Sequence, residues 1–429
     1  MITARAFAGK HYAVYGLARS GLATAEALLA SGARVTAWDA KEEAKAKAPA
    51  GTELANLDEA DLSQFDSLVV TPGLPLNRHP IAGRAREAGV EIIGDIELFA
   101  RARPELPPHK VVGITGTNGK STTTALVHHI LKTAGVQTTM GGNIGLPILT
   151  QDPLPEGGVY VLELSSYQID LTQSLNCDVA VLLNITPDHL DRYESFEAYA
   201  ASKARLFEMQ SSQHALIANP QSDTAHGLAM QHIAGKPQSY PLWEDFADHP
   251  EQARWPSLQG PHNLENAEAA RAAVEELGVP LETIIEGLRS YPGLPHRMER
   301  IREKDGVLFV NDSKATNPTA TAPALAAFER IRWICGGQAK TDNLDECAPH
   351  FGHVASAYTI GEAGELFARL LSPQMPVKNC GKLDVAVREA AADATAGDTV
   401  LLSPACASFD QFRDFEERGD QFRQLVGGL

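Results

Sequence analysis

Short apolar runs and helical patterns alternate along the chain, and the alternation begins near the N-terminus. An apolar run at residues 11–17 is followed by a helical pattern at about 22–30 and by a second apolar run at 33–38, which ends at Asp39. Strand, glycine turn, helix, strand and acidic residue is the order of a Rossmann-type unit. Because Ala18 replaces the middle glycine of the dinucleotide pattern, the turn suits either a phosphate at the helix N-terminus or a purely structural role.

The same alternation continues to the C-terminus. Further strands are predicted at residues 67–71, 90–93, 110–114, 159–164, 179–185, 307–310, 331–335, 357–360 and 400–402. Further helices are predicted at residues 120–134, 196–209 and 263–277, after Pro318, at 385–394, and up to residue 425. This order predicts an α/β chain with mostly parallel sheets covered on both faces. Three prolines predict a linker near residues 102–110, and Gly293-Leu294-Pro295 interrupts the pattern again.

Composition narrows the class of protein. The chain has 429 residues, of which 44% are hydrophobic and 21% are charged, as in folded globular proteins of roughly three domains. The formal net charge of −17, without a long Lys/Arg run, argues against nucleic acid or an anionic membrane as a partner. The N-terminus has no signal-type apolar core, and no stretch is long enough to cross a membrane. We expect a cytoplasmic protein, monomeric by default.

The cysteines agree with a reducing compartment. There are five, an odd number, and none of the widely spaced pairs reads as CxxC. This pattern argues against a disulfide framework and against a zinc site. We expect these side chains to be small buried hydrophobic groups.

The segment with the clearest chemistry is residues 115–122, Thr-Gly-Thr-Asn-Gly-Lys-Ser-Thr, between a predicted strand and a predicted helix. Its glycines allow backbone N–H groups to wrap around a triphosphate. Lys120 adds a positive charge for the outer phosphates, and the Ser121 hydroxyl is a ligand for Mg²⁺. Ile114 stands where the strict GxxxxGK[ST] pattern has glycine. The glycines, lysine and serine that suit a bound triphosphate are nevertheless present. We therefore expect an ATP-binding loop.

Four other polar positions in the middle of the chain each have two interpretations. Glu163 ends an apolar strand, where it suits a magnesium ligand or a salt-bridged loop acid. The turn 184–192, with His189, follows the next apolar strand and gathers possible metal ligands. Lys203 lies on a helix, where a lysine is usually solvated. Asn263 lies at a predicted helix start, where an N-cap explains it equally well.

Three polar loops follow strands in the last third of the chain. They are residues 311–318, 336–340 and 403–408. Loops at the carboxyl ends of parallel strands converge on one rim of a doubly wound sheet, which is where ligands bind. Lys314, Lys340 and Ser408 contribute two cations and a hydroxyl, which suit a small anionic substrate such as one that carries carboxylates.

Together these segments resemble the Mur ligases of peptidoglycan synthesis over essentially the full length. The resemblance is carried by residues 115–122, 141–145, 163–168, 188–193, 262–263, 294–297, 311–317 and 403–412. The segments 311–317 and 403–412 resemble the D-glutamate-adding members most. The resemblance implies a Rossmann-like domain at 1–98 that binds the uridine nucleotide, a P-loop-type ATP domain at 99–296, and a Rossmann-like amino-acid domain at 297–429.

The same resemblance implies an activity. Such an enzyme adds D-glutamate to UDP-N-acetylmuramoyl-L-alanine with ATP, through an acyl phosphate, and uses Mg²⁺, with two ions expected. The substrates are small molecules, and neither nucleic acid nor a membrane takes part. Either a carboxylate or the metal-bound His189 is a candidate helper for deprotonating the incoming amine, and the sequence does not distinguish the two.

The resemblance also assigns residues. The ATP contacts that it implies are Gly116, Thr117, Asn118, Gly119, Lys120, Ser121, Thr122, Asn263, Arg297 and Asp312. The metal ligands and catalytic groups that it implies are Lys120, Ser121, Glu163, His189 and Lys203, with Lys203 carbamylated. The contacts to the UDP substrate that it implies are Arg19, Ser20, Asp39, Gly73, Asn143 and His189. The contacts to D-glutamate that it implies are Lys314, Thr316, Lys340, Ser408 and Phe415.

Two segments depart from the family pattern, and other functions stay open. Residues 336–340 lack the Asp-Gly expected before Lys340, and the residue types around Arg19 and Asp39 match loosely, with Lys41 nearby. The first alternative is an amide ligase with the same ATP core and another amino acid or substrate, such as a folate-polyglutamating enzyme. The second is a nucleotide-dependent switch, and the third is an NAD(P) oxidoreductase, suggested only by the opening turn.

Overall fold

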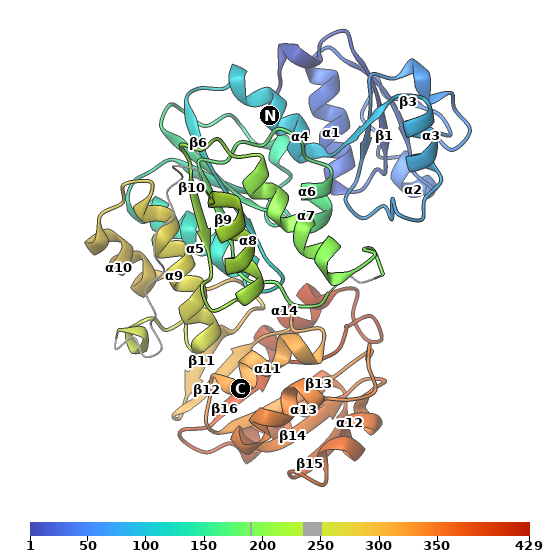
Figure 1. Ribbon diagram of the computed structural model, residues 1–429. Helices are drawn as coiled ribbons and strands as arrows, with labels where there is room; N and C mark the ends of the chain where they lie inside the picture. The colour runs from blue at the N-terminus through green and yellow to red at the C-terminus, as the bar shows by residue number, and fades with distance from the viewer. Residues whose placement is uncertain (189–190, 235–250) are drawn as a thin grey trace. The chain divides into compact units, whose positions relative to one another are not determined.

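The structure is a computed structural model that describes residues 1–188, 191–234 and 251–429. The chain is a three-domain α/β protein with one sheet in each domain. It divides into two compact units, Met1–Asp245 with Asn266–Gly287 and Phe246–Glu265 with Leu288–Leu429. The first two sheets belong to the first unit and the third sheet belongs to the second unit (Figure 1).

The first domain is built on a five-stranded parallel sheet in the order β3-β2-β1-β4-β5. The strands are β1 (His11–Tyr15), β2 (Arg34–Trp38), β3 (Glu53–Leu54), β4 (Ser67–Val70) and β5 (Glu91–Ile93). The helices are α1 (Arg19–Ala30), α2 (Glu42–Lys45) and α3 (Ile81–Glu87). Val14 and Leu28 belong to the core on the α1 side, whereas Tyr15 and Ile81 belong to the core on the other face. This is the expected Rossmann-like arrangement.

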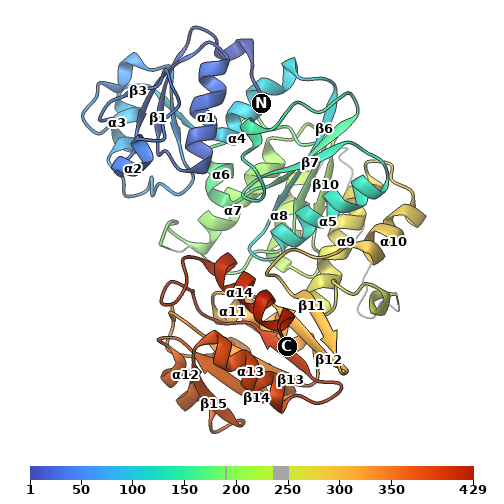
Figure 2. The same cartoon turned by 180° about the vertical axis from the view of Figure 1, so that it is seen from behind.

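The second domain has a parallel sheet in the order β10-β9-β6-β8-β7. The strands are β6 (His109–Thr115), β7 (Thr138–Gly142), β8 (Gly158–Glu163), β9 (Val179–Leu182) and β10 (Ala215–Ala218). The helices are α4 (Asp95–Ala102), α5 (Lys120–Thr133), α6 (Ser166–Asp170), α7 (Phe196–Glu208), α8 (Asp223–Ile233), α9 (Pro261–Glu275) and α10 (Leu281–Ser290). Helix α5 contacts β6, β7 and β8, and α10 approaches it through Gly287 and Ile130 (Figure 2).

The first two domains share one hydrophobic core. Phe99 on α4 and Leu149 in the short helix η4 (Ile148–Thr150) pack in the same cluster as Leu28 of α1. The prolines near residues 102–110 therefore do not form a free linker. Pro104 lies in the 3-10 helix η3 (Arg103–Glu105), where its missing N–H is tolerated at the first turn, and β6 begins four residues later.

The third domain has a six-stranded sheet in the order β11-β12-β16-β13-β14-β15, parallel except for the outermost pair β11–β12. The strands are β11 (Glu299–Lys304), β12 (Val307–Asn311), β13 (Ile331–Gly336), β14 (Val354–Ile360), β15 (Val377–Gly381) and β16 (Thr399–Leu402). The helices are α11 (Pro318–Ala326), α12 (Gly364–Leu371), α13 (Leu383–Asp393) and α14 (Phe415–Gly427). Helices α11 and α12 contribute to the core on one face, and α13 and α14 to the core on the other.

The predicted strands agree with the observed ones within a few residues. The interpretation of the cysteines as buried groups holds for Cys177, Cys335, Cys347 and Cys406, whereas Cys380 is half-buried. In the described part of the chain, no helix combines the length and the apolar character that a bilayer-spanning segment needs.

Candidate active site

The predicted ATP loop lies between β6 and α5, as expected, and its backbone requires glycine at two places. Gly116 has φ of +152°, and a Cβ there would lie 3.0 Å from Leu183 Cβ. Gly119 has φ of +83° at the start of α5, and a Cβ there would lie 2.2 Å from Asn266 Oδ1. Both positions favour glycine, because a side chain in either conformation is strained. The conformation of the loop therefore depends on both glycines.

Two residues that sequence reasoning left without a role hold this loop in place. The Asn184 carbonyl oxygen accepts from Thr117 N at 2.8 Å, and its Oδ1 accepts from Asn118 N at 2.9 Å. The Thr117 hydroxyl lies 3.1 Å from the hydroxyl of Tyr199. Asn184 lies two residues after the end of β9, so its position near a strand end was the signal that could have identified it.

Two lysines converge on one carbonyl oxygen of the loop. Lys120 Nζ donates to Gly116 O at 2.9 Å and to Thr117 O at 2.7 Å. Lys203 Nζ, from α7, donates to the same Gly116 O at 2.9 Å. Lys203 is 2% exposed, so the interpretation of a solvated helix lysine is wrong. Burial, followed by repulsion from Lys120, holds the pKa of the Lys203 amine well below its usual value.

Glu163 ends β8 beside this loop, since it pairs with Ile114 in the register of β6 and β8. The side chain is 2% exposed, and Asn143 Nδ2 donates to its Oε1 at 2.8 Å. Its Oε2 is buried and has no hydrogen-bond partner within the described residues. A buried carboxylate oxygen of this kind needs a partner, and no salt bridge among the described residues involves it. Within the described residues Glu163 is therefore a hydrogen-bonded acid without a salt bridge.

The remaining predicted metal ligands are only partly described. Ser121 is buried in the first turn of α5, and Thr122 beside it is half-buried. His189 lies outside the described residues. Among those that are described, no three His, Cys, Asp or Glu side chains form a ready metal cluster.

The predicted contacts to the UDP substrate lie at the carboxyl ends of strands. Asp39 accepts from Leu17 N at 2.8 Å and from Lys41 N at 2.9 Å, which closes the turn after β1. Arg19 donates to Gly145 O at 2.8 Å, a residue that follows β7 in the second domain. Gly73 lies in the loop after β4. The structure therefore places these residues in the loops where a Rossmann-like sheet binds ligands.

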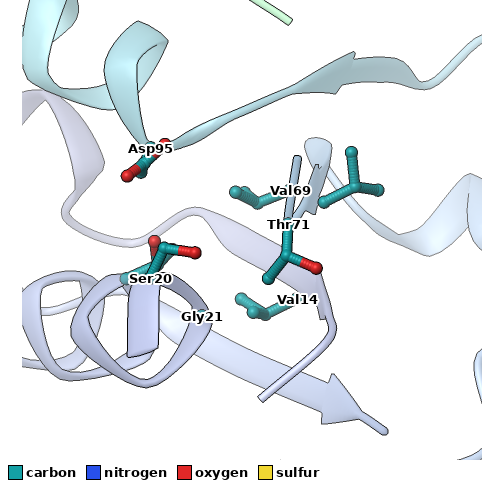
Figure 3. Close-up of a pocket in the computed structure, with 8 residues that line it drawn as sticks. Val14, Ser20, Gly21, Val69, Thr71 and Asp95 are labelled. Carbon is teal, nitrogen blue, oxygen red and sulfur yellow. The ribbon is translucent and has the colours of Figure 1, made fainter. Parts of the chain in front are cut away.

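Ser20 has a different environment from the other predicted contacts to the UDP substrate. It borders a narrow crevice next to Thr24 and Asp95, which has no room for a water molecule (Figure 3). Asp95 begins α4, its Oδ1 is buried without a hydrogen-bond partner within the described residues, and burial raises its pKa to about 6. A contact between Ser20 and the substrate stays a prediction.

The three polar loops of the third domain converge, as predicted. The backbones of Gln338 and Ala407 exchange two hydrogen bonds of 2.9 and 3.0 Å. Arg418 of α14, which sequence reasoning missed, is fully buried and donates to Ser313 O at 2.8 Å and to Cys406 O at 3.1 Å. It thereby ties the loop after β12 to the loop after β16. Its position inside an otherwise ordinary final helix gave no signal.

The predicted D-glutamate contacts differ in exposure. Lys314 Nζ lies 4.4 Å from the centre of the Phe415 ring, within the range of a cation–π contact. Ser408 is 2% exposed, whereas Thr316 is half-buried and Lys340 is exposed. The structure thus brings Lys314 and Phe415 together directly and leaves the Lys340 side chain in solvent.

Hydrogen bonds within the protein hold two of the predicted contacts to the adenine and ribose of ATP, Asn263 and Asp312. Asn263 Nδ2 donates to Gln259 O at 3.0 Å; because α9 begins at Pro261, Asn263 lies inside the first turn and the N-cap interpretation is wrong. Asp312 accepts from Ser403 Oγ at 2.8 Å and from Met298 N at 3.2 Å. Burial raises the pKa of Asp312 to about 7, although Ser403, Met298 and the nearby Arg297 favour its charged form.

Comparison with known proteins covers every part of the chain. Residues 10–94 match the "Mur ligase MurD-like, N-terminal domain", 114–274 the "Mur ligase middle domain", and 296–406 the "Mur ligase, glutamate ligase domain". The chain is 60% identical to the UDP-N-acetylmuramoylalanine–D-glutamate ligase of Novosphingobium aromaticivorans, over 100% of this chain and 97% of that one. It is 58% identical to the enzyme of the same name from Sphingopyxis alaskensis, over 100% of both.

Solved structures agree at the level of the fold. The UDP-N-acetylmuramate-alanine ligase MurC of Thermotoga maritima matches with a TM-score of 0.60 at 16% identity, over 98% of this chain and 99% of that one. MurF of Acinetobacter baumannii matches with a TM-score of 0.58 at 16% identity, over 98% and 90%. These structures share the architecture, and the two relatives share more than half of the sequence along its full length. The chain therefore belongs to the Mur ligase family.

Proposed function

We propose that this protein is an ATP-dependent amide ligase that joins D-glutamate to UDP-N-acetylmuramoyl-L-alanine during peptidoglycan precursor synthesis. The observation that carries the chemistry is the convergence of Lys120 and Lys203 on Gly116 O, with the buried Glu163 on the neighbouring strand. The identity of the substrates rests on the relatives, which are named for this reaction and match over the full length.

Amide formation from a free carboxylate needs an activated leaving group. In the proposed reaction the terminal alanine carboxylate attacks the γ-phosphorus of ATP, so a C–O–P linkage forms and ADP leaves. The deprotonated amine of D-glutamate then attacks the acyl carbon of this acyl phosphate through a tetrahedral intermediate. Collapse of the intermediate forms the C–N bond and releases inorganic phosphate. The enzyme contributes position and charge stabilisation to both steps.

Lys120 and the loop amides provide that charge stabilisation at the triphosphate. In the structure Lys120 Nζ is held by the carbonyl oxygens of Gly116 and Thr117. The ammonium group is therefore already hydrogen-bonded to its own loop. When ATP binds, anionic phosphate oxygens would replace these two neutral carbonyl acceptors. Charge-assisted hydrogen bonds are stronger than those to carbonyl groups. We infer that Lys120 moves from the carbonyl groups to the outer phosphates when ATP binds.

The residues beside the loop fit a magnesium ion. Glu163 offers a buried carboxylate oxygen that has no partner among the described residues, and Ser121 offers a hydroxyl at the start of α5. Mg²⁺ prefers oxygen ligands and keeps several waters, so one carboxylate and one hydroxyl beside phosphates suffice. When bound, the ion neutralises the negative charge of the phosphoryl group that is transferred. A second ion, with His189 among its ligands, is part of the proposal.

Lys203 is proposed to be carbamylated. A buried lysine whose pKa is lowered by desolvation and by Lys120 holds a larger fraction of neutral amine than an exposed one. The neutral nitrogen attacks the carbon of CO₂, forms an N–C bond and loses a proton to water, which leaves a carbamate anion. The product replaces a cation beside Lys120 with an anion, so it removes a like-charge repulsion. That anion supports the second metal ion.

The other predicted roles are proposed as substrate-binding roles of the first and third domains. The first domain, residues 1–98, would hold the uridine nucleotide through Arg19, Ser20, Asp39 and Gly73. The third domain, residues 297–429, would hold D-glutamate through its three joined loops. The ATP contacts of Asn263, Arg297 and Asp312, a monomeric state and a cytoplasmic location remain predictions.

A phosphate-release assay tests the function. The protein is incubated with ATP, Mg²⁺ and UDP-N-acetylmuramoyl-L-alanine, and each D- and L-amino acid is added in turn. We expect phosphate release with D-glutamate and release at background level with the others. Release with another amino acid would identify a different ligase of the family. Release that needs no amino acid would favour a nucleotide-dependent switch, and binding of nicotinamide dinucleotide would favour the oxidoreductase.

A further inference from the structure

Arg192 contacts the loop after β4, which contains Gly73, a predicted contact to the UDP substrate. Arg192 follows the turn that carries Asp188, and its guanidinium reaches the loop after β4. Its NH1 donates to Gly73 O at 3.3 Å, and its NH2 donates to Leu74 O at 2.9 Å and to Pro72 O at 3.4 Å. One side chain of the second domain thus gathers three consecutive carbonyl groups of the first, within one compact unit.

The return contacts come from the same loop. Asn77 Nδ2 donates to Asp191 O at 3.1 Å, and Arg78 NH2 donates to the same oxygen at 2.7 Å. Hydrogen bonds therefore run in both directions between residues 72–78 and residues 191–192. A single bond between exposed loops contributes little, but a set of five that shares two backbone segments fixes their relative position.

The Arg192 side chain is itself held in one orientation. Its guanidinium lies 4.4 Å from the centre of the Tyr167 ring, and Tyr167 stacks with Tyr193 at 6.2 Å and 14° between the ring planes. A planar guanidinium stacks on an aromatic face and still donates from its edge, which a lysine ammonium cannot do. The arrangement is therefore specific to arginine.

The same segment is connected to the helix that carries Lys203. The hydroxyl of Tyr193 donates to Asp170 Oδ2 at 2.8 Å, and Ser202 Oγ donates to Asp170 Oδ1 at 2.7 Å. Ser202 precedes Lys203, which donates to the ATP loop. A continuous series of contacts thus runs from the loop after β4 to the ATP loop.

The geometry at Pro72-Gly73 shows what this contact does. A trans peptide group directs its N–H opposite to its carbonyl oxygen. When Arg192 draws the Pro72 carbonyl toward itself, the Gly73 N–H is turned away from Arg192. Gly73 is exposed, so its N–H is available as a donor to an oxygen of the nucleotide sugar.

We propose that Arg192 is a positioning residue that orients the Pro72–Leu74 turn for the UDP substrate and links that turn to the ATP loop. The proposal rests on the proposed function, because it names which substrate the turn serves. A purely structural cross-link is the alternative. It would lower stability without a preference among the three substrates.

The experiment compares Arg192→Lys and Arg192→Ala with the wild type, and with Arg86→Ala as a matched control on the exposed face of α3. For both Arg192 variants we expect KM for UDP-N-acetylmuramoyl-L-alanine to rise about tenfold or more, as for loss of a charge-assisted hydrogen-bond set. KM for ATP and for D-glutamate should change less than about twofold. Arg86→Ala should match the wild type.

Direct binding separates failure of this proposal from failure of the proposed function. Calorimetric titration with UDP-N-acetylmuramoyl-L-alanine alone requires no ligase activity, and both Arg192 variants should bind it about tenfold more weakly than the wild type. An unchanged dissociation constant in folded variants would overturn the positioning role, and so would an equal rise in all three KM values. If the wild type binds this ligand but releases no phosphate with D-glutamate, the proposed function fails while the role of Arg192 is still measured.

Discussion

The ATP loop and the loops of the third domain both use lysines, but they hold them differently. Lys120 and Lys203 donate to one carbonyl oxygen of the ATP loop, and Lys203 is buried. In the third domain Arg418 is the buried cation, and it is fully engaged with backbone groups, whereas Lys340 is exposed. The first region is organised for chemistry before any ligand binds. The second is a hydrogen-bonded frame that presents an exposed cation.

The comparison predicts the largest loss for Lys120→Ala. Removal of this ammonium takes away a charge aimed at the phosphates, so kcat/KM should fall about 10²- to 10³-fold. ADP formation is measured by a coupled assay, and circular dichroism checks that the fold persists. Lys132→Ala, at an exposed position on the same helix α5, should behave as the wild type. A Lys120→Ala variant with normal turnover would contradict the assignment of the loop.

The second-largest effect is expected for Lys203→Ala. Loss of the carbamate should lower kcat by about 10- to 100-fold, the range seen when support of a metal ligand is removed. Added short carboxylic acids should restore part of the activity, because they fill the same space with an anion. Lys203→Arg keeps a cation but cannot form a carbamate, so without added acid it should show the same loss of activity as Lys203→Ala. Absence of rescue, together with absence of a carbamate in the mass spectrum or crystal, would count against this role.

A smaller and more selective effect is expected for Lys340→Ala. Because the side chain is exposed, its loss should leave the fold and the KM for ATP unchanged. KM for D-glutamate should rise about tenfold, as for one charge-assisted hydrogen bond. Lys382→Ala, another exposed lysine of the same domain, is the control. Equal effects on both substrates would disprove a role on the glutamate side.

The smallest expected effect concerns the stability of the third domain. The folded-state pKa of Asp312 is about 7, above the value of about 4 in an unfolded chain, so the folded state binds the proton more tightly. The Asp312 contribution to the free energy of unfolding is therefore complete below about pH 4 and is lost as pH rises to about 7. Asp312→Asn should remove about 2 kcal/mol of this dependence between pH 5 and pH 7. Urea denaturation at pH 5 and pH 7 measures it, and equal pH dependence in both proteins would argue against the raised pKa.

Sequence patterns predicted the buried strands well and the polar ones poorly. Continuous apolar runs such as β8 and β16 are visible because parallel strands are buried on both faces. Strands β3, β10 and β15 were missed, of which β10 is apolar and buried but only four residues long. Strands β7 and β11 were also missed, since β7 reads Thr-Thr-Met-Gly-Gly and β11 alternates charges. Edge strands of this kind carry too few apolar residues to stand out from loops.

The site shows the same division between local and tertiary information. The ATP loop follows from local sequence, because its glycines, lysine and serine are adjacent. Burial of Lys203 could not be predicted, since its helix position alone favours solvent, and only the family resemblance pointed to it. Arg418 and Arg192 were missed because their partners lie far away in sequence. Contacts of that kind are decided by the folded chain and not by any window of residues.

Strand β11 has a further consequence for the behaviour of the protein at high concentration. It forms one outer border of the third sheet, and five of its six residues, Glu-Arg-Ile-Arg-Glu-Lys, are charged. An approaching strand from another molecule would have to bring its backbone against alternating ions and displace their hydration. Such borders discourage intermolecular β-pairing. The polar sequence that hid this strand from prediction thus protects the sheet against aggregation.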